Sequence, residues 1–241
     1  MNDGHICPPP RLVLFDLDDT LCDYASARVG RLRRAFGEAL ARVPGGEHVD
    51  LDEMVAESIK IQPHGSDHFG QMLAQYGAGR DDLVQRAKAW FHSNRFMGLA
   101  LFPGAADLLD DLRALDPAPG IGLITNGPTE VQEAKLDLLK IRGKIDFALI
   151  SESFGAPKPD SKIFAAALEQ GHVTANEAVF IGDSPEYDID GARRAGIRTV
   201  WMDHGRMSWP ADLPRPDWIV HNIAELRTLL LGDKAPGSGA Q

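Results

Sequence analysis

The sequence has only two cysteines, and neither stands in a pattern typical of a metal site or a disulfide framework. Cys7 and Cys22 form no Cys-x-x-Cys pair and no Cys/His ligand spacing. Such sparse cysteine usage fits a reducing compartment, so we expect a cytoplasmic protein. The first residues lack a basic start followed by an apolar run, and no apolar stretch approaches the ~18 residues of a membrane span. We therefore expect neither a secretory signal nor a membrane partner.

Positive charge is also scarce. The chain has 25 lysines and arginines against 35 aspartates and glutamates, which gives a net charge of −10. Proteins that bind nucleic acid usually carry a basic excess or a basic stripe, so we expect no nucleic-acid partner. A small phosphorylated substrate stays compatible with this charge, because a metal ion and a few local donors can recruit it.

The sequence shows no internal repeat and no heptad pattern of apolar residues, so it predicts no particular oligomeric state. We expect a monomer or a homodimer. Its 241 residues, 44% of them hydrophobic, suit one large soluble domain or a domain with a substantial insertion.

Short apolar runs alternate with amphipathic helical patterns in residues 11–22 and 100–231. The runs are Leu12 to Phe15, Ile121 to Ile124, Phe147 to Ile150, Ala178 to Ile181, Thr199 to Met202 and Trp218 to Val220. Strand–helix–strand alternation of this kind predicts an α/β fold, with a parallel sheet covered by helices on both faces.

Residues 23–99 break this rhythm. Apolar residues recur there at three- and four-residue steps, as in ASARVGRLRRAFGEALARV, and no strand candidate interrupts them. We therefore predict an inserted all-helical subdomain at 23–99. The segments 1–10, with three consecutive prolines, and 232–241, small and polar, are expected to be tails.

Three aspartates follow the first predicted strand, in LVLFDLDDTL, and two of them, Asp16 and Asp18, are two residues apart. In extended chain the spacing of two points Asp16 and Asp18 the same way. Adjacent carboxylates repel each other unless a cation lies between them, and magnesium favours such oxygen ligands. A carboxylate can also attack phosphorus, and a second one can move protons. An ordinary strand end with an aspartate capping the next turn explains the pair equally well.

Three further strand ends carry polar residues that a core strand does not need. Thr125 and Asn126 could hold phosphate oxygens, and the Lys158 ammonium could neutralise phosphate charge. Asp183 could complete a metal site with Asp16, and Asp188 could orient Lys158. Each feature taken alone could be a helix cap, a solvated lysine or a helix-start acid. Taken together, they supply the different parts of one phosphoryl-transfer site.

These motifs resemble those of the haloacid dehalogenase superfamily. DLDDT resembles its first motif, Thr125 in ITN the second, Lys158 in KPD the third and GDSPEYD the fourth, and the match spans roughly residues 11–231. The resemblance implies a Rossmann-like three-layer core at 11–22 and 100–231 with a helical cap at 23–99. It also implies a phosphatase-like hydrolase that uses Mg²⁺.

The resemblance further implies a role for each residue. Asp16 would be the nucleophile and Asp18 the acid and base, with Lys158 stabilising charge. Thr125, the Asn126 backbone and Lys158 would bind phosphate. Asp16, Asp183 and the backbone carbonyl of Asp18 would bind the metal, while Asp188 would orient Lys158 without contacting the metal or the substrate. The expected reaction is hydrolysis of a small phosphorylated metabolite, such as a nucleotide or a sugar phosphate, through an aspartyl phosphate.

Three other functions stay open. The dehalogenases of this superfamily attack carbon and need no leaving-group acid, and they lack an aspartate at the position of Asp18. A phosphomutase would use the same core with help from the cap. A non-catalytic, ligand-binding protein would usually have lost one of the residues named above, and none is missing here.

Overall fold

The computed structural model of the chain describes residues 5–62 and 65–232. Two compact units make up the chain. The core unit consists of Met1–Asp23 and Leu101–Gln241, and the helical unit is Tyr24–Ala100. No helix in the described part of the chain has the length and apolar character needed to cross a membrane. The cytoplasmic location and the monomeric or dimeric state stay predictions.

Six parallel strands form the sheet of the core unit, in the order β3-β2-β1-β4-β5-β6. The strands are β1 (Leu12–Phe15), β2 (Gly120–Thr125), β3 (Phe147–Ile150), β4 (Ala178–Gly182), β5 (Arg198–Met202) and β6 (Trp218–Val220). All six lie at the predicted apolar runs, with ends that differ by one residue at most. The predicted parallel α/β fold is confirmed.

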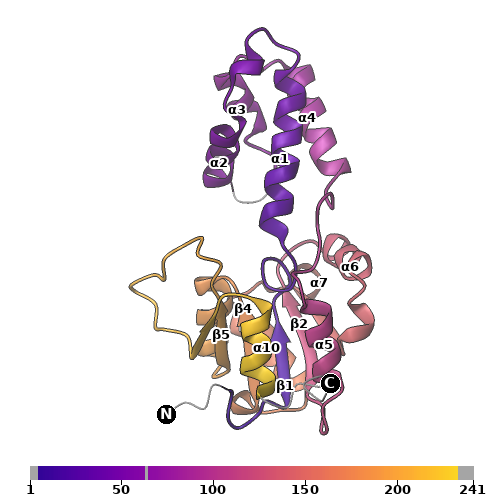
Figure 1. Cartoon of the computed structure of the whole chain (residues 1–241), viewed down its shortest axis with the longest axis vertical. Helices are drawn as coiled ribbons and strands as arrows, with labels where there is room; N and C mark the ends of the chain where they lie inside the picture. Colours follow the sequence, from indigo (N-terminus) through magenta and orange to yellow (C-terminus); the bar gives the residue numbers. More distant parts are fainter. Residues whose placement is uncertain (1–4, 63–64, 233–241) are drawn as a thin grey trace, which may run out of the picture. The chain divides into compact units, whose positions relative to one another are not determined.

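Helices cover this sheet because its central strands are buried on both faces. The helices of the core unit are α5 (Ala105–Arg113), α6 (Thr129–Leu138), α7 (Ser151–Phe154), α8 (Ser161–Gln170), α9 (Gly191–Arg194) and α10 (Ile223–Leu231). Leu12 and Leu14 of β1 pack with Phe164 and Ala167 of α8 in one apolar cluster. Helices α5 and α10 contact each other and lie in front of the sheet in Figure 1.

Short helical turns complete the core unit. Two 3₁₀ turns, η2 (Arg142–Lys144) and η3 (Ala175–Glu177), precede strands, and a π-helical turn, η4 (Pro185–Asp190), follows β4. The carboxylate of Asp160 accepts a hydrogen bond from the Lys162 N–H and caps the N-terminus of α8.

The helical unit contains α1 (Tyr24–Leu40), a 3₁₀ turn η1 (Gly46–His48), α2 (Leu51–Ile61), α3 (Phe69–Gln75) and α4 (Asp81–Ser93). Helix α1 packs against each of the other three helices. Phe36, Phe69 and Phe91 lie at the centre of its buried apolar cluster. The helical unit therefore has a hydrophobic core of its own.

The described part of the expected N-terminal tail, residues 5–10, contacts the core unit although it has no helix or strand. Ile6 is buried, and its N–H donates to the Leu229 carbonyl at 3.0 Å. Arg198 donates to the Pro8 carbonyl at 2.7 Å. Residues 1–4 of that tail, and 233–241 of the expected C-terminal tail, lie outside the described residues.

Candidate active site

Polar residues stand where four neighbouring strands of the core unit end. Asp16 follows β1, Thr125 is the last residue of β2, Ser151 follows β3 and Asp183 follows β4. In a parallel sheet these ends share one edge, which is where ligands bind in open α/β folds. The side chains predicted from separate motifs are therefore brought to one place.

Three carboxylates gather at this edge. One oxygen each of Asp16, Asp183 and Asp188 lies within 4.8 Å of the others, and this carboxylate cluster meets the geometric requirement for a cation site. Asp16 and Asp188 are buried and Asp183 is partly buried. Hard divalent cations such as Mg²⁺ prefer oxygen donors of this kind.

The cluster is short of positive charge. Burial raises the pKa of Asp16 to about 7, against the opposing effect of Lys158 and with a further contribution from Asp188. Burial and the two neighbouring carboxylates likewise raise the pKa of Asp183 to about 9. Among the residues that the structure describes, a single ammonium faces the three carboxylates, so a bound divalent cation would reduce their mutual repulsion.

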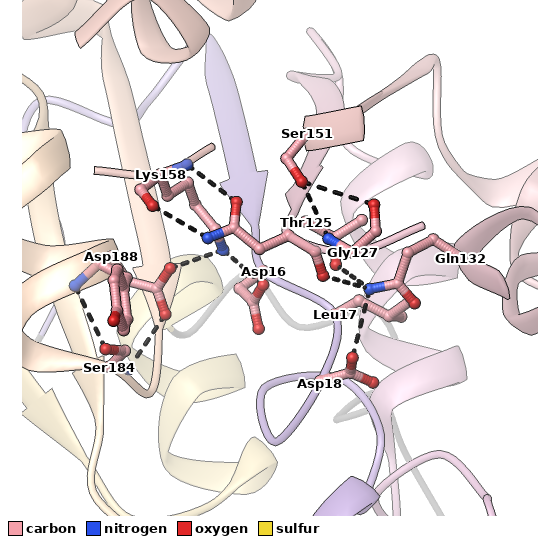
Figure 2. Close-up of polar contacts among 12 residues, drawn as sticks. Asp16, Leu17, Asp18, Thr125, Gly127, Gln132, Ser151, Lys158, Ser184 and Asp188 are labelled. Atoms are coloured by element: carbon pink, nitrogen blue, oxygen red, sulfur yellow. Dashed lines mark hydrogen bonds and ion pairs between the residues drawn. The ribbon is translucent and has the colours of Figure 1, made fainter. Parts of the chain in front are cut away.

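Lys158 supplies that ammonium. Its Nζ lies 2.5 Å from an Asp16 oxygen and 2.6 Å from an Asp188 oxygen, so that in Figure 2 it points between the two carboxylates. The side chain is only 3% exposed and lies over the Phe180 ring. Burial alone would lower the pKa of Lys158, but the two carboxylates raise it above its usual value, so the residue stays charged.

The backbone at Lys158 is fixed by Asn126. The Lys158 N–H donates to the Asn126 side-chain oxygen at 2.8 Å, and the Asn126 amide donates to the Lys158 carbonyl at 3.0 Å. This reciprocal pair ties the loop after β2 to the loop before α8. The Asn126 side chain thus holds the loops together, while the contact of its backbone with phosphate stays a prediction.

The π-helical turn η4 holds Asp188 in place. The Ser184 N–H donates to Asp188 at 3.0 Å, and the Ser184 hydroxyl accepts from the Tyr187 N–H at 3.2 Å (Figure 2). Gly182 permits this approach, because a Cβ on it would lie 2.5 Å from three atoms of the Asp188 side chain.

Asp18 lies outside the carboxylate cluster. Its side chain is bound by two residues of α6, Gln132 and Lys135, which the sequence motifs did not predict. The Lys135 ammonium lies 2.6 and 2.8 Å from the two Asp18 oxygens. The Gln132 amide nitrogen lies 3.3 Å from Asp18 and 2.6 Å from the Thr125 hydroxyl, and Figure 2 shows it between the two.

A signal for these two residues is present in the sequence. Positions 132, 135, 136 and 139 form an i, i+3, i+4, i+7 stripe, which is the buried face of a helix. Leu136 and Leu139 are ordinary on such a face, whereas a glutamine and a lysine are not. Both polar residues are buried in the structure.

Known proteins resemble this chain in sequence and in fold. A family model described as haloacid dehalogenase-like hydrolase matches residues 10–196. A glyceraldehyde 3-phosphate phosphatase from Pyrococcus abyssi is 33% identical over 207 residues, covering 81% of this chain and 82% of the relative.

Two solved structures extend the comparison. The magnesium-bound hydrolase YfnB from Bacillus subtilis has a TM-score of 0.69 at 24% identity, covering 92% of this chain and 99% of its own. A 2-haloacid dehalogenase from Pseudomonas syringae has a TM-score of 0.54 at 34% identity, covering 89% and 95%. The family predicted from the four motifs is confirmed: the chain belongs to the haloacid dehalogenase-like hydrolases.

Proposed function

We propose that this protein is a Mg²⁺-dependent phosphatase that hydrolyses a small phosphomonoester through an aspartyl phosphate on Asp16. The observation that carries the proposal is the carboxylate cluster with its buried Lys158, one strand away from the Thr125 hydroxyl. Relatives with phosphatase activity, such as the glyceraldehyde 3-phosphate phosphatase, support phosphomonoester hydrolysis.

The residues present fit a magnesium ion. Carboxylate oxygens of Asp16 and Asp183, with the backbone carbonyl of Asp18, would hold it, and both carboxylates belong to the cluster whose oxygens lie within 4.8 Å of one another. When bound, the ion supplies positive charge to the phosphoryl oxygens and to the attacking carboxylate.

The chain's own residues divide the remaining work. Lys158 holds Asp16 at 2.5 Å and can neutralise charge on a transferring phosphoryl group. The Thr125 hydroxyl is placed to donate to a phosphate oxygen. Because Lys158 is buried and doubly ion-paired, its position is set before the substrate arrives.

Two proton-coupled steps follow from this arrangement. In the first, an Asp16 oxygen attacks phosphorus, the bond from phosphorus to the leaving oxygen breaks, and the Asp18 proton passes to that oxygen. In the second, Asp18 takes a proton from water, the water oxygen attacks phosphorus, and the bond to Asp16 breaks to release phosphate.

Dehalogenation is the second candidate, because the 2-haloacid dehalogenase is 34% identical to this chain. Displacement of halide from carbon requires a nucleophilic carboxylate but no acid for the leaving group. Asp18 and its two partners on α6 would then have no task. Release of halide from a 2-haloacid, measured with an ion-selective electrode, would favour this candidate over the phosphatase.

Hydrolysis of p-nitrophenyl phosphate and of a panel of phosphomonoesters tests the proposal. We expect turnover with Mg²⁺, none with excess EDTA, and recovery when Mg²⁺ is added back. Asp16→Asn should abolish turnover, while Asp212→Asn, at an exposed aspartate, should not change it. A folded protein that hydrolyses no member of the panel with Mg²⁺ would refute the proposal.

A further inference from the structure

We propose that Gln132 and Lys135 on α6 are positioning residues that hold the Asp18 side chain for proton transfer, apart from the carboxylate cluster. This inference rests on the proposed phosphatase function, in which Asp18 is the acid and base. Neither residue belongs to the four motifs.

Their burial shows that they serve a partner inside the protein. Gln132 is 2% exposed and Lys135 is 4% exposed. A buried ammonium is costly unless it is paired. Lys135 meets that requirement by lying 2.6 and 2.8 Å from the two oxygens of Asp18. The pairing restrains the carboxylate at both oxygens and so restricts its rotation.

The Gln132 amide adds a second restraint. Its Nε2 faces three oxygens: the Thr125 hydroxyl at 2.6 Å, the Asn126 carbonyl at 2.8 Å and Asp18 at 3.3 Å. A carbonyl oxygen only accepts, so the Gln132 amide nitrogen must be the atom that faces the Asn126 carbonyl. Gln132 therefore donates to the Thr125 hydroxyl oxygen, which directs the hydroxyl proton elsewhere, and one side chain orders both Thr125 and Asp18.

As a result, Asp16 and Asp18 pair with different lysines. Lys158 pairs with Asp16 and Lys135 pairs with Asp18. Within the described residues the cation-binding cluster comprises Asp16, Asp183 and Asp188, and Asp18 contributes no side-chain oxygen to it. The Asp18 side chain is still 24% exposed, so a leaving group or a water molecule can reach it.

If Gln132 and Lys135 position Asp18, their loss should affect the first step, in which the ester bond breaks, according to the basicity of the leaving group. Protonation of the leaving oxygen by Asp18 matters when that oxygen is strongly basic and matters little when it leaves readily as an anion. Phenolate is a much more basic leaving group than p-nitrophenolate. Loss of Asp18 positioning should therefore slow the cleavage of phenyl phosphate more than that of p-nitrophenyl phosphate.

The experiment compares kcat/KM for these two esters with Mg²⁺, because kcat/KM reports the steps up to formation of the aspartyl phosphate. We expect Lys135→Met to lower kcat/KM for phenyl phosphate by about tenfold or more beyond any loss with p-nitrophenyl phosphate. Lys135→Arg, which keeps the charge, should restore part of the ratio. Lys162→Met, at an exposed lysine of α8, is the matched control and should leave the ratio unchanged.

Gln132→Met provides an independent variant that keeps the lysine, in case Lys135→Met does not fold by circular dichroism. It should shift the ratio in the same direction. An equal loss for both esters, or no loss, in a folded variant would overturn the inference. A wild-type protein that hydrolyses neither of these esters nor any other phosphomonoester of the panel would instead refute the proposed function, so the two failures can be told apart.

Discussion

Asp16 and Asp18 are two residues apart in the chain, yet their surroundings differ. Asp16 is buried beside Asp183 and Asp188, with Lys158 at 2.5 Å. Asp18 is partly exposed and is held by α6. A nucleophile needs a fixed, desolvated position, whereas a proton carrier must reach both the leaving group and water. The two environments match these two tasks.

Substituting Asp18 tests this division. Asp18→Asn keeps the shape of the side chain and removes its ability to carry a proton. We expect kcat for an alkyl phosphate to fall by about a hundredfold or more, because general acid–base catalysis typically contributes 10²–10⁴-fold. KM should change little, since the side chain does not bind the phosphoryl group. Steady-state kinetics with Mg²⁺ measures both, and a near-normal kcat would contradict the assignment.

Some residues of the site could be predicted from the sequence and others could not. Asp16, Thr125 and Asp183 lie at the ends of apolar runs that predict strands, so a parallel sheet is expected to bring them to one edge. Lys158 lies eight residues beyond the end of β3, with α7 between them, and only its KPD motif points to the site. Gln132 and Lys135 could not be found in this way, because their role depends on which face of α6 turns inward. That information lies in the packing of the helix and only faintly in the residue types.

At the scale of elements, the apolar runs predicted all six strands, but not their order in the sheet. The order of the strands depends on which neighbour each strand pairs with after its crossover connection, and local sequence patterns carry no information on that. The turn η4 was likewise not predicted, because its form depends on contacts between Ser184 and Asp188. A single residue of β4, Gly182, makes room for that turn.

Gly182→Ala should therefore disturb the site more than the fold. Its Cβ would lie 2.5 Å from the Asp188 side chain and would push it away from Lys158. We expect a loss of stability of about 1–3 kcal/mol, as for other overpacked positions, together with a large loss of kcat. Gly143→Ala, where a Cβ meets nothing within 4 Å, is the control. Urea denaturation and kinetics that match wild type would contradict this account of Gly182.

The whole molecule combines two units that each have an apolar core. Phe36 and Phe69 belong to the core of the helical unit, and Leu14 and Phe180 to that of the core unit. The chain leaves and re-enters the core unit at adjacent points, because Cys22 pairs with Leu101 and the Phe102 N–H donates to the Leu21 carbonyl at 2.9 Å. We infer that the core unit can fold without residues 24–100.

Excising residues 24–100 tests that inference. A linker of about four residues, the length of a hairpin loop, would join Asp23 to Leu101. We expect a single cooperative thermal transition and the circular dichroism of an α/β protein. Mg²⁺ should raise the melting temperature, because a ligand that binds only the native state stabilises it. A molten product without a cooperative transition would show that the core unit depends on the helical unit.

The central claim is that Asp16 carries the phosphoryl group between the two steps. Acid quenching of the enzyme during turnover with Mg²⁺ and a phosphomonoester, followed by borohydride reduction, converts an aspartyl phosphate to homoserine. Mass spectrometry of the peptide that contains Asp16 and Asp18 then locates it. The account predicts homoserine at position 16, and none in Asp16→Asn. Homoserine at position 18, or turnover without homoserine at any aspartate position, would contradict it.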